Sequence, residues 1–189
     1  MEDFEKDIGK CLAILSDGGT ILYPTDTIWG IGCDATNAKA VKKIYALKKR
    51  SDEKALIVLV ASEREILRYV AQPDLSVFDY LKTVVKPTTV IYEGAIGLAD
   101  NLVGADGTIA IRICNEKFCR QLINRFKKPI VSTSANISGH APPSNFSAID
   151  DEIKNKADYI VSYRQLDNAP AEPSALIKWQ KGNAIVLRP

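Results

Sequence analysis

The chain has 189 residues, of which 46% are hydrophobic and 25% are charged, an ordinary composition for one globular domain. Its 25 basic and 23 acidic residues leave a formal charge of +2, which gives no support to nucleic-acid binding through global charge, although a local patch stays open. The charged first residues precede no long apolar run, so neither a signal peptide nor a membrane span is visible. We therefore expect a single domain over residues 1–189, in the cytoplasm and without membrane contact.

The four cysteines, Cys11, Cys33, Cys114 and Cys119, form no C-x-x-C pair, and His140 is the one histidine. This set lacks the spacing and the ligands of a structural zinc site. We expect reduced thiols and no metal bound directly by protein side chains.

Apolar residues at helical spacing predict helices over 4–15, 37–49, 62–70, 73–81, 115–126 and 147–154. Asn37, Ser62, Asn115 and Ser147 are the expected N-caps, and Ser62 forms a capping box with Glu65. Short β-rich runs predict strands over 20–23, 55–60, 108–113, 129–131, 159–161, 175–179 and 184–187, and a turn followed by a strand over 86–92. Strands that alternate with helices indicate an α/β domain.

Hydroxyl and amide side chains crowd the stretch 128–139, directly after the buried strand expected over 129–131. Ser132, Ser134 and Asn136 can donate and accept hydrogen bonds, and no base lies beside either serine. Open α/β sheets bind ligands at the carboxyl ends of their strands, which favours a binding site here. A helix N-cap or an Asx-turn would use the same residue types, and that alternative stays open.

A second polar segment, Thr25-Asp26-Thr27, follows the strand over 20–23, where Pro24 takes the chain out of the ladder. A simple turn explains this segment equally well. Gly30-x-Gly32-x-x-Ala35 is also a weak match to a dinucleotide-binding fingerprint. That fingerprint requires an acidic residue about 20 residues on, where Lys48-Lys49-Arg50 stand, so we do not favour a dinucleotide site.

Four cations, Lys48, Lys49, Arg50 and Lys54, fall within seven residues before the strand over 55–60. Cations at a helix C-terminus are stabilised by the helix dipole, which is the simplest explanation. The functional alternative is a clamp for a polyphosphate, because arginine and lysine both bind phosphate oxygens.

Arg112 interrupts the apolar strand over 108–113, and it shares one face of that strand with Thr108 and Ala110. An arginine in such a strand lies at a sheet edge or pairs with an acid; otherwise it points at an anionic ligand. The polar segments together contain no nucleophile–base pair, no paired acids and no metal cluster. They suit the positioning and electrostatic stabilisation of a polyanion, as in phosphoryl or nucleotidyl transfer, and the residues alone lead no further.

Four motifs, in this order along the chain, resemble the YrdC family: YPTDTIWG at 23–30, Lys48-x-Arg50 with Lys54, IAIR at 109–112, and STSANISG at 132–139. The similarity extends over nearly the whole chain. The resemblance implies the YrdC/RibB-like fold, a twisted open mixed α/β sheet flanked by helices around a basic concave cavity. It also implies a nucleotidyltransferase activity, that of an L-threonylcarbamoyladenylate synthase, which makes threonylcarbamoyl-AMP and pyrophosphate from L-threonine, bicarbonate and ATP with Mg²⁺.

The resemblance further implies a role for each matching residue. Threonine would be bound by Thr27, Lys54, Arg112, Ser132 and Ser174. ATP would be bound by Lys48, Arg50, Thr108, Ser134, Asn136 and Arg188, with Lys48 and Arg50 stabilising charge and no side chain acting as acid or base. The expected partner is a tRNA threonylcarbamoyl-transferase complex that modifies the adenosine beside the anticodon, and a contact with tRNA or double-stranded RNA is a further expectation.

Three departures from the family pattern affect the expected contacts. Val84-Val85-Lys86-Pro87 replaces Trp-Pro-Gly-Pro before Thr88-Thr89, Ala175 replaces a threonine after Ser174, and Ser51 stands where proline often follows the arginine. Two alternatives remain beside the synthase: a carbamoyl-adenylate-forming relative, as in hydrogenase maturation proteins, and a non-catalytic module that binds double-stranded RNA or assists ribosome assembly.

The clamp interpretation predicts that Arg50→Ala abolishes turnover while the free energy of unfolding changes little, because a guanidinium that binds the phosphates of a ligand acts on turnover more than on folding. Steady-state turnover and urea unfolding measure the two effects. Near-normal turnover of the variant would contradict the clamp.

Overall fold

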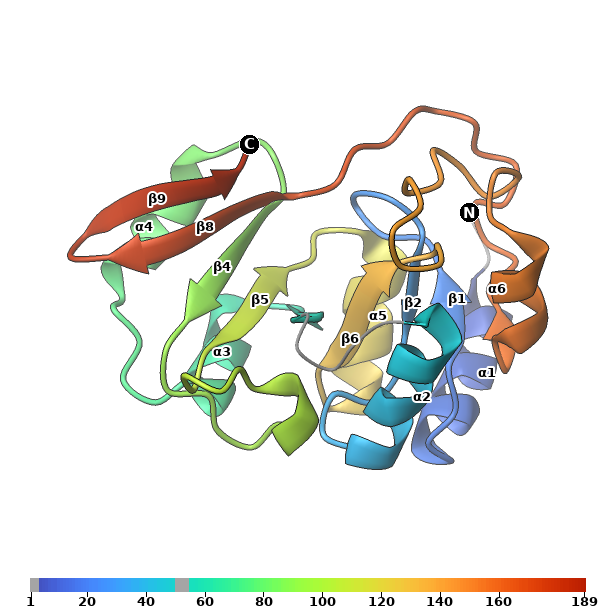
Figure 1. Cartoon of the computed structure of the whole chain (residues 1–189), viewed down its shortest axis with the longest axis horizontal. Helices are drawn as coiled ribbons and strands as arrows, with labels where there is room; N and C mark the ends of the chain where they lie inside the picture. Colours follow the sequence, from blue (N-terminus) through green and yellow to red (C-terminus); the bar gives the residue numbers. More distant parts are fainter. Residues whose placement is uncertain (1–3, 50–54) are drawn as a thin grey trace.

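The computed structural model describes residues 4–49 and 55–189. Its strands are β1 (Ile21–Tyr23), β2 (Gly30–Gly32), β3 (Ile57–Val60), β4 (Thr88–Tyr92), β5 (Ile109–Ile113), β6 (Ile130–Ser134), β7 (Tyr159–Ile160), β8 (Ala175–Gln180) and β9 (Asn183–Arg188). They form one nine-stranded sheet in the order β7-β1-β2-β6-β3-β5-β4-β8-β9. Figure 1 shows the β8–β9 hairpin at one end of the molecule and α1 and α6 at the other.

The sheet is mixed, as expected. The pairs β1–β7, β3–β5 and β4–β8 are parallel, whereas β1–β2, β2–β6, β3–β6, β4–β5 and β8–β9 are antiparallel. Strand β6 therefore lies between β2 and β3 and joins the two halves of the sheet. The expected open α/β sheet flanked by helices is confirmed, while its behaviour as one folding domain stays a prediction.

The helices are α1 (Glu5–Ser16), α2 (Ala38–Lys48), α3 (Glu63–Tyr69), α4 (Ser76–Thr83), α5 (Lys117–Phe126) and α6 (Asp151–Lys156), with a 3-10 turn η1 (Asp100–Leu102). One buried cluster packs α1 and α5 against β1 through residues such as Ile8, Phe118 and Ile21. A second cluster contains buried residues of α2, α3 and α4 together with Val58 and Ile111 of the central strands. In β3, Val58 and Leu59 belong to different clusters, as the alternation of a strand requires.

All six expected helices are present, although α4 and α6 lie two to four residues further along the chain than expected, and two of the four expected caps are wrong. Asn37 does cap α2, since its side chain accepts hydrogen bonds from Lys39 N and Ala40 N. Glu116, not Asn115, caps α5 by accepting from Cys119 N at 2.8 Å. Asp150, not Ser147, caps α6 by accepting from Glu152 N at 2.7 Å. In both cases a carboxylate, which bonds an N–H more strongly than a neutral group does, takes the cap position.

Ser62 takes the N-cap position of α3, but the expected capping box is not formed. The hydroxyl of Ser62 makes no cap hydrogen bond. Its expected partner Glu65 does reach back across the first turn, but it accepts from Ala61 N at 2.6 Å.

The glycines of the weak dinucleotide fingerprint lie in a strand and form no phosphate-binding loop. Gly30 and Gly32 bound β2, which pairs with β1 on one side and with β6 on the other. A Cβ atom added to Gly32 would lie 1.8 Å from the carbonyl oxygen of Val131, so no larger residue fits without movement of the backbone. The glycines allow β2 and β6 to approach closely.

The helices in the described part of the chain lack the combination of length and apolar character that a bilayer-spanning segment needs.

The close approach of β2 and β6 predicts that Gly32→Ala lowers the free energy of unfolding by about 3 kcal/mol or more, because the backbone of Val131 must shift. Gly9→Ala is the matched control, since Gly9 lies within α1 with no atom near its added Cβ. We expect Gly9→Ala to raise stability by about 0.5–1 kcal/mol, as alanine does at an exposed helix position. Urea unfolding measures both variants, and equal stability of Gly32→Ala and the wild type would contradict the packing argument.

Candidate functional site

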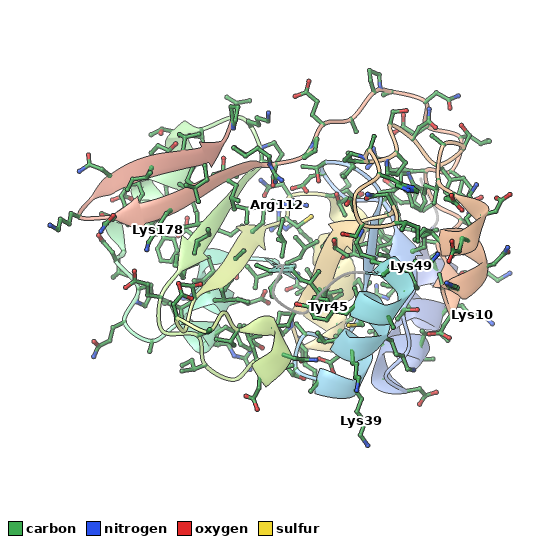
Figure 2. All side chains as sticks on the ribbon, viewed as in Figure 1. Lys10, Lys39, Tyr45, Lys49, Arg112 and Lys178 are labelled. Atoms are coloured by element: carbon green, nitrogen blue, oxygen red, sulfur yellow. The ribbon has the colours of Figure 1, made fainter. Side chains whose placement is uncertain are left out.

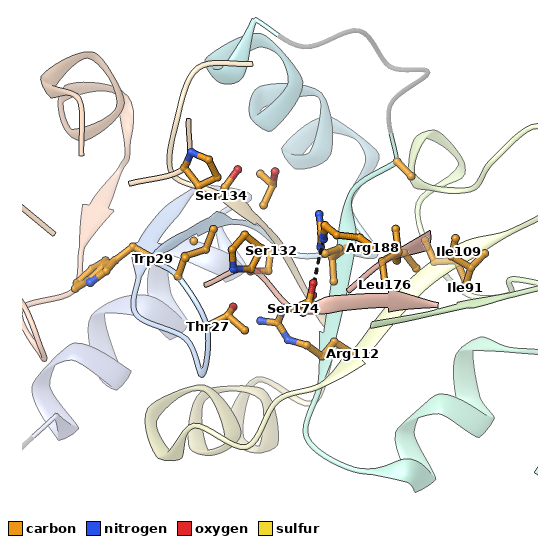
Figure 3. Close-up of a pocket in the computed structure, with 18 of the residues that line it drawn as sticks. Thr27, Trp29, Ile91, Ile109, Arg112, Ser132, Ser134, Ser174, Leu176 and Arg188 are labelled. Atoms are coloured by element: carbon orange, nitrogen blue, oxygen red, sulfur yellow. Dashed lines mark hydrogen bonds between the residues drawn. The ribbon is translucent and has the colours of Figure 1, made fainter. Parts of the chain in front are cut away.

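A cavity of about 300 Å³ lies where the β1–β2 loop, β5, β6 and the segment before β8 meet. It brings together seven of the predicted site residues from distant parts of the chain: Thr27, Thr108, Arg112, Ser132, Ser134, Ser174 and Arg188. Figure 3 shows Thr27, Ser132 and Ser134 towards one end and Ile91, Ile109 and Leu176 at the other. We call the first side, which also contains Trp29, the polar end of the cavity, and the second side, beside Arg188, the apolar end.

The β1–β2 loop is held by its own hydroxyls. Thr25 Oγ1 donates to Ile28 O at 2.8 Å and accepts from Thr27 N at 3.0 Å. Since that donation uses the one hydroxyl proton of Thr25, the 3.0 Å contact between Thr25 Oγ1 and Thr27 Oγ1 must be a donation by Thr27. The oxygen of Thr27 is thereby left to accept a hydrogen bond in the cavity.

Arg112 lies in the interior of the molecule, whereas Lys39 projects outwards (Figure 2). Only 4% of Arg112 is exposed, and its Nη2 lies 3.1 Å from Asp26 Oδ1 and 3.5 Å from Thr25 Oγ1. Its Nε is buried and has no hydrogen-bond partner among the described residues. Arg112 thus pairs with an acid, as one of the two interpretations of the sequence expects, and it also lines the cavity. A contact with an anionic ligand stays a prediction. Of the two placements expected for such an arginine, the acid partner is the one found, since β5 lies between β3 and β4 and is not an edge strand.

The two serines of β6 reach the cavity because they share one face of the strand. Ser132 pairs with Ile57 of β3, and Ser134 pairs with Gly30 of β2. A Cβ atom added to Gly30 would lie 2.8 Å from Ser132 Oγ, so the absence of a side chain at Gly30 makes room for this hydroxyl. The polar segment after Val131 therefore continues the strand, and the N-cap alternative for Ser132 and Ser134 is wrong.

Ser174 is fixed by contacts that the sequence did not reveal. It is buried, and its Oγ lies 2.8 Å from Thr89 Oγ1 on β4. Arg188 donates from Nε to Ser174 O at 3.0 Å, which ties the end of β9 to the cavity. Thr89 belongs to the segment that departs from the family pattern, and its place behind Ser174 follows from the parallel pairing of β4 with β8. No local signal in the sequence marks this contact.

Lys48 and Asn136 do not line the cavity, although both were predicted to contact ATP. Lys48 is fully buried, and its ammonium donates to the carbonyl oxygens of Ser134 and, at 2.6 Å, Asn136. Asn136 donates in turn to Ile137 O and His140 O, at 2.9 and 2.8 Å. In this geometry both residues support the loop that follows β6, and a direct phosphate contact from either stays a prediction. Arg50 and Lys54 lie outside the described residues.

The cysteines are poor candidates for a nucleophile. All four thiols are free and buried. Burial raises the pKa of the thiols of Cys11, Cys33 and Cys119 far above its usual value, which suppresses the reactive thiolate. In the described part of the chain, no group of three or more His, Cys, Asp and Glu residues could hold a metal ion.

A family model described as telomere recombination, which covers Sua5, YciO and YrdC, matches residues 13–189. The chain belongs to the Sua5/YciO/YrdC family. It is 34% identical over 172 residues to a putative threonylcarbamoyl-AMP synthase of Methanocaldococcus jannaschii, a match that covers 91% of this chain and 80% of the relative. It is 32% identical over 160 residues to the threonylcarbamoyl-AMP synthase of Vibrio parahaemolyticus, covering 82% of this chain and 84% of the relative.

Solved structures of the family share the fold. P. abyssi Sua5 complexed with L-threonine superposes with a TM-score of 0.86 at 23% identity, over 98% of this chain and 54% of that one. This chain thus spans about half the length of P. abyssi Sua5. E. coli YciO superposes with a TM-score of 0.80 at 20% identity, over 97% of this chain and 89% of that one. At these identities the structures confirm the expected YrdC-like fold and do not by themselves assign a substrate.

The contacts of Lys48 predict that Lys48→Met lowers the free energy of unfolding by about 1–3 kcal/mol, because two carbonyl groups lose a charged donor. We also expect faster amide hydrogen exchange at Asn136. Lys43→Met is the control: Lys43 also lies on α2, but its Nζ donates to Gly18 O, away from the cavity. Equal exchange at Asn136 in both variants would contradict the supporting role of Lys48.

Proposed function

We propose that this chain is an L-threonylcarbamoyladenylate synthase, a nucleotidyltransferase that forms threonylcarbamoyl-AMP and pyrophosphate from L-threonine, bicarbonate and ATP. Curated relatives that carry this name match four fifths or more of the chain at 32–34% identity. Family membership alone does not fix the substrate, so the proposal depends on the cavity. The observation that carries it is the meeting of seven predicted substrate-binding residues around one cavity.

The two ends of the cavity suit the two larger substrates. At the polar end, the guanidinium of Arg112 suits a carboxylate, and the oxygen of Thr27 suits a hydroxyl or amine donor. At the other end, Ile91, Ile109 and Leu176 offer an apolar surface beside Arg188, which suits a nucleoside and its phosphates. The threonine amine and the phosphates of ATP would thus meet in the part of the cavity between its two ends.

The reaction needs positioning and charge stabilisation more than acid–base catalysis. The threonine amine and bicarbonate form a carbamate with loss of water, and a carbamate oxygen then attacks the α-phosphorus of ATP. The bond from the α-phosphorus to the oxygen that bridges to the β-phosphate breaks, and pyrophosphate leaves. Hydroxyl donors and the Arg188 cation would stabilise the charge on the phosphate oxygens. Lys48 would act on this step through the loop that it supports.

We infer that Mg²⁺ accompanies ATP as part of the bound substrate. Among the described residues that line the cavity, the polar side chains are hydroxyls and arginines, with no carboxylate. Magnesium prefers oxygen ligands, retains water and binds commonly through substrate phosphates, which fits such a lining. The ion would neutralise part of the triphosphate charge beside Arg188.

The proposed product implies a further enzyme. A mixed anhydride of a carbamate and AMP is an activated group that must be passed on, so we propose a tRNA threonylcarbamoyl-transferase complex as the consuming partner. A direct contact with tRNA or double-stranded RNA stays a prediction, as does the cytoplasmic location.

The test is pyrophosphate release from ATP and bicarbonate, with and without L-threonine. We expect release only with threonine, and poor release with glycine, which lacks the hydroxyl and methyl groups, because a site shaped for the side chain loses contacts. Arg112→Ala should abolish the pyrophosphate release that depends on threonine.

Two other outcomes would overturn the proposal. Release with carbamoyl phosphate in place of threonine and bicarbonate would assign the chain to the carbamoyl-adenylate-forming relatives. Absence of release under both conditions, with binding of double-stranded RNA, would favour a non-catalytic module.

A further inference from the structure

The carboxylate of Asp26 contacts Arg112, which lines the cavity, but Asp26 has no part in the proposed reaction. Asp26 Oδ1 lies 3.1 Å from Arg112 Nη2, and Asp26 Oδ2 accepts a hydrogen bond from Asn115 N at 3.0 Å. The side chain of Asp26 is 11% exposed. We propose that Asp26 is a positioning residue that fixes the guanidinium of Arg112 for the carboxylate of the amino-acid substrate. This inference rests on the proposed function and deepens it.

Asp26 is itself well fixed, which a positioning residue must be. It lies in the β1–β2 loop, and its two oxygens contact residues at the end of β5 and directly after it. The neighbouring Thr25 is held by the loop's internal hydrogen bonds and lies 3.5 Å from the same Nη2 atom. Two consecutive residues of one loop therefore define where Nη2 lies.

The donors that remain on Arg112 suit one substrate carboxylate. Nη2 faces Asp26 and Thr25, while Nε and Nη1 make no hydrogen bond to the described residues. Arg112 also lines the cavity, where its guanidinium lies between Thr27 and Ser174 (Figure 3). A long side chain loses rotamer freedom when it binds, and a guanidinium that is already held loses less. Asp26 would thus raise affinity for the amino acid before any substrate arrives.

Two opposed effects decide the sign of a mutation at this position. Removing the negative charge of Asp26 would strengthen the attraction between the cavity and an anionic carboxylate. Removing the ion pair with Asp26 would also release the guanidinium and leave a buried charge without its counter-charge. We expect release to dominate, because an asparagine can keep the hydrogen bond from Asn115 N but, being neutral, loses the ion pair with Arg112.

The test compares Asp26→Asn with the wild type in steady-state kinetics and in calorimetric titration with L-threonine. We expect the KM and the Kd for threonine to rise by about 10-fold or more, while kcat and the KM for ATP change by less than about 3-fold. An unchanged or tighter threonine Kd would overturn the inference, and so would an equal rise in the KM values for threonine and ATP. Asp26→Glu keeps the charge, and we expect it to recover part of the affinity.

A ligand without the carboxylate separates positioning from general damage. L-threoninamide should bind wild type and Asp26→Asn with similar affinity, because it cannot form the ion pair with Arg112. An equal loss for threonine and threoninamide would mean that the variant only disturbs the structure.

Asp34→Asn is the matched control. Asp34 is also a buried carboxylate that contacts a cation, Lys128 Nζ at 2.7 Å, and a backbone amide, Thr36 N at 2.8 Å. Its cation partner Lys128 does not line the cavity, whereas Arg112, the partner of Asp26, does. We expect this variant to be less stable with an unchanged threonine Kd.

The same titration separates the two proposals. Wild-type protein that binds threonine but releases no pyrophosphate would overturn the proposed function, and the variants would still decide the role of Asp26. Wild-type protein that binds no threonine would overturn both.

Discussion

The cavity depends on the compensation of one buried charge. Arg112 belongs to a strand in the interior of the sheet, where an isolated cation would cost several kcal/mol. Asp26 supplies the opposite charge from a different part of the chain, and the β1–β2 loop must therefore lie against the end of β5. The same contact brings Thr27 to the cavity. The free-energy cost of burying the Arg112 guanidinium thus determines where the β1–β2 loop lies, and this loop forms part of the polar end of the site.

The second constraint is the position of β6 between two strands that are remote from it in sequence. Its serines reach the cavity because β2 and β3 flank it, and because the glycines of β2 leave space on the shared face. Beyond the strand, Lys48 holds the following loop by its carbonyl oxygens. A buried ammonium that donates hydrogen bonds to two carbonyl groups is well satisfied, since hydrogen bonds from a charged donor are among the stronger ones. The two serines that line the cavity are therefore supported by the flanking strands and by the loop that Lys48 holds.

Periodicity predicted the helices and most of the strands correctly, because the apolar faces of α1, α2 and α5 are buried at the positions that helical spacing requires. Periodicity did not predict β2, because a short segment with two glycines is typical of a loop and only its pairing with β6 makes it a strand. The caps of α5 and α6 were misplaced by one and by three residues, because several polar residues precede each helix and only the backbone path decides which one bonds the first turn.

The sequence alone determined the family, the α/β class and the types of side chain available for an anionic substrate, since these depend on local pattern and on motifs that stay in order along the chain. Only the tertiary structure decided how those residues are used. It placed Lys48 behind the loop and Thr89 beneath Ser174, and it paired Asp26 with Arg112. Each of these contacts joins segments more than eighty residues apart. Strand pairing and the cost of burying charge decide such contacts, and neither is visible in the neighbouring residues.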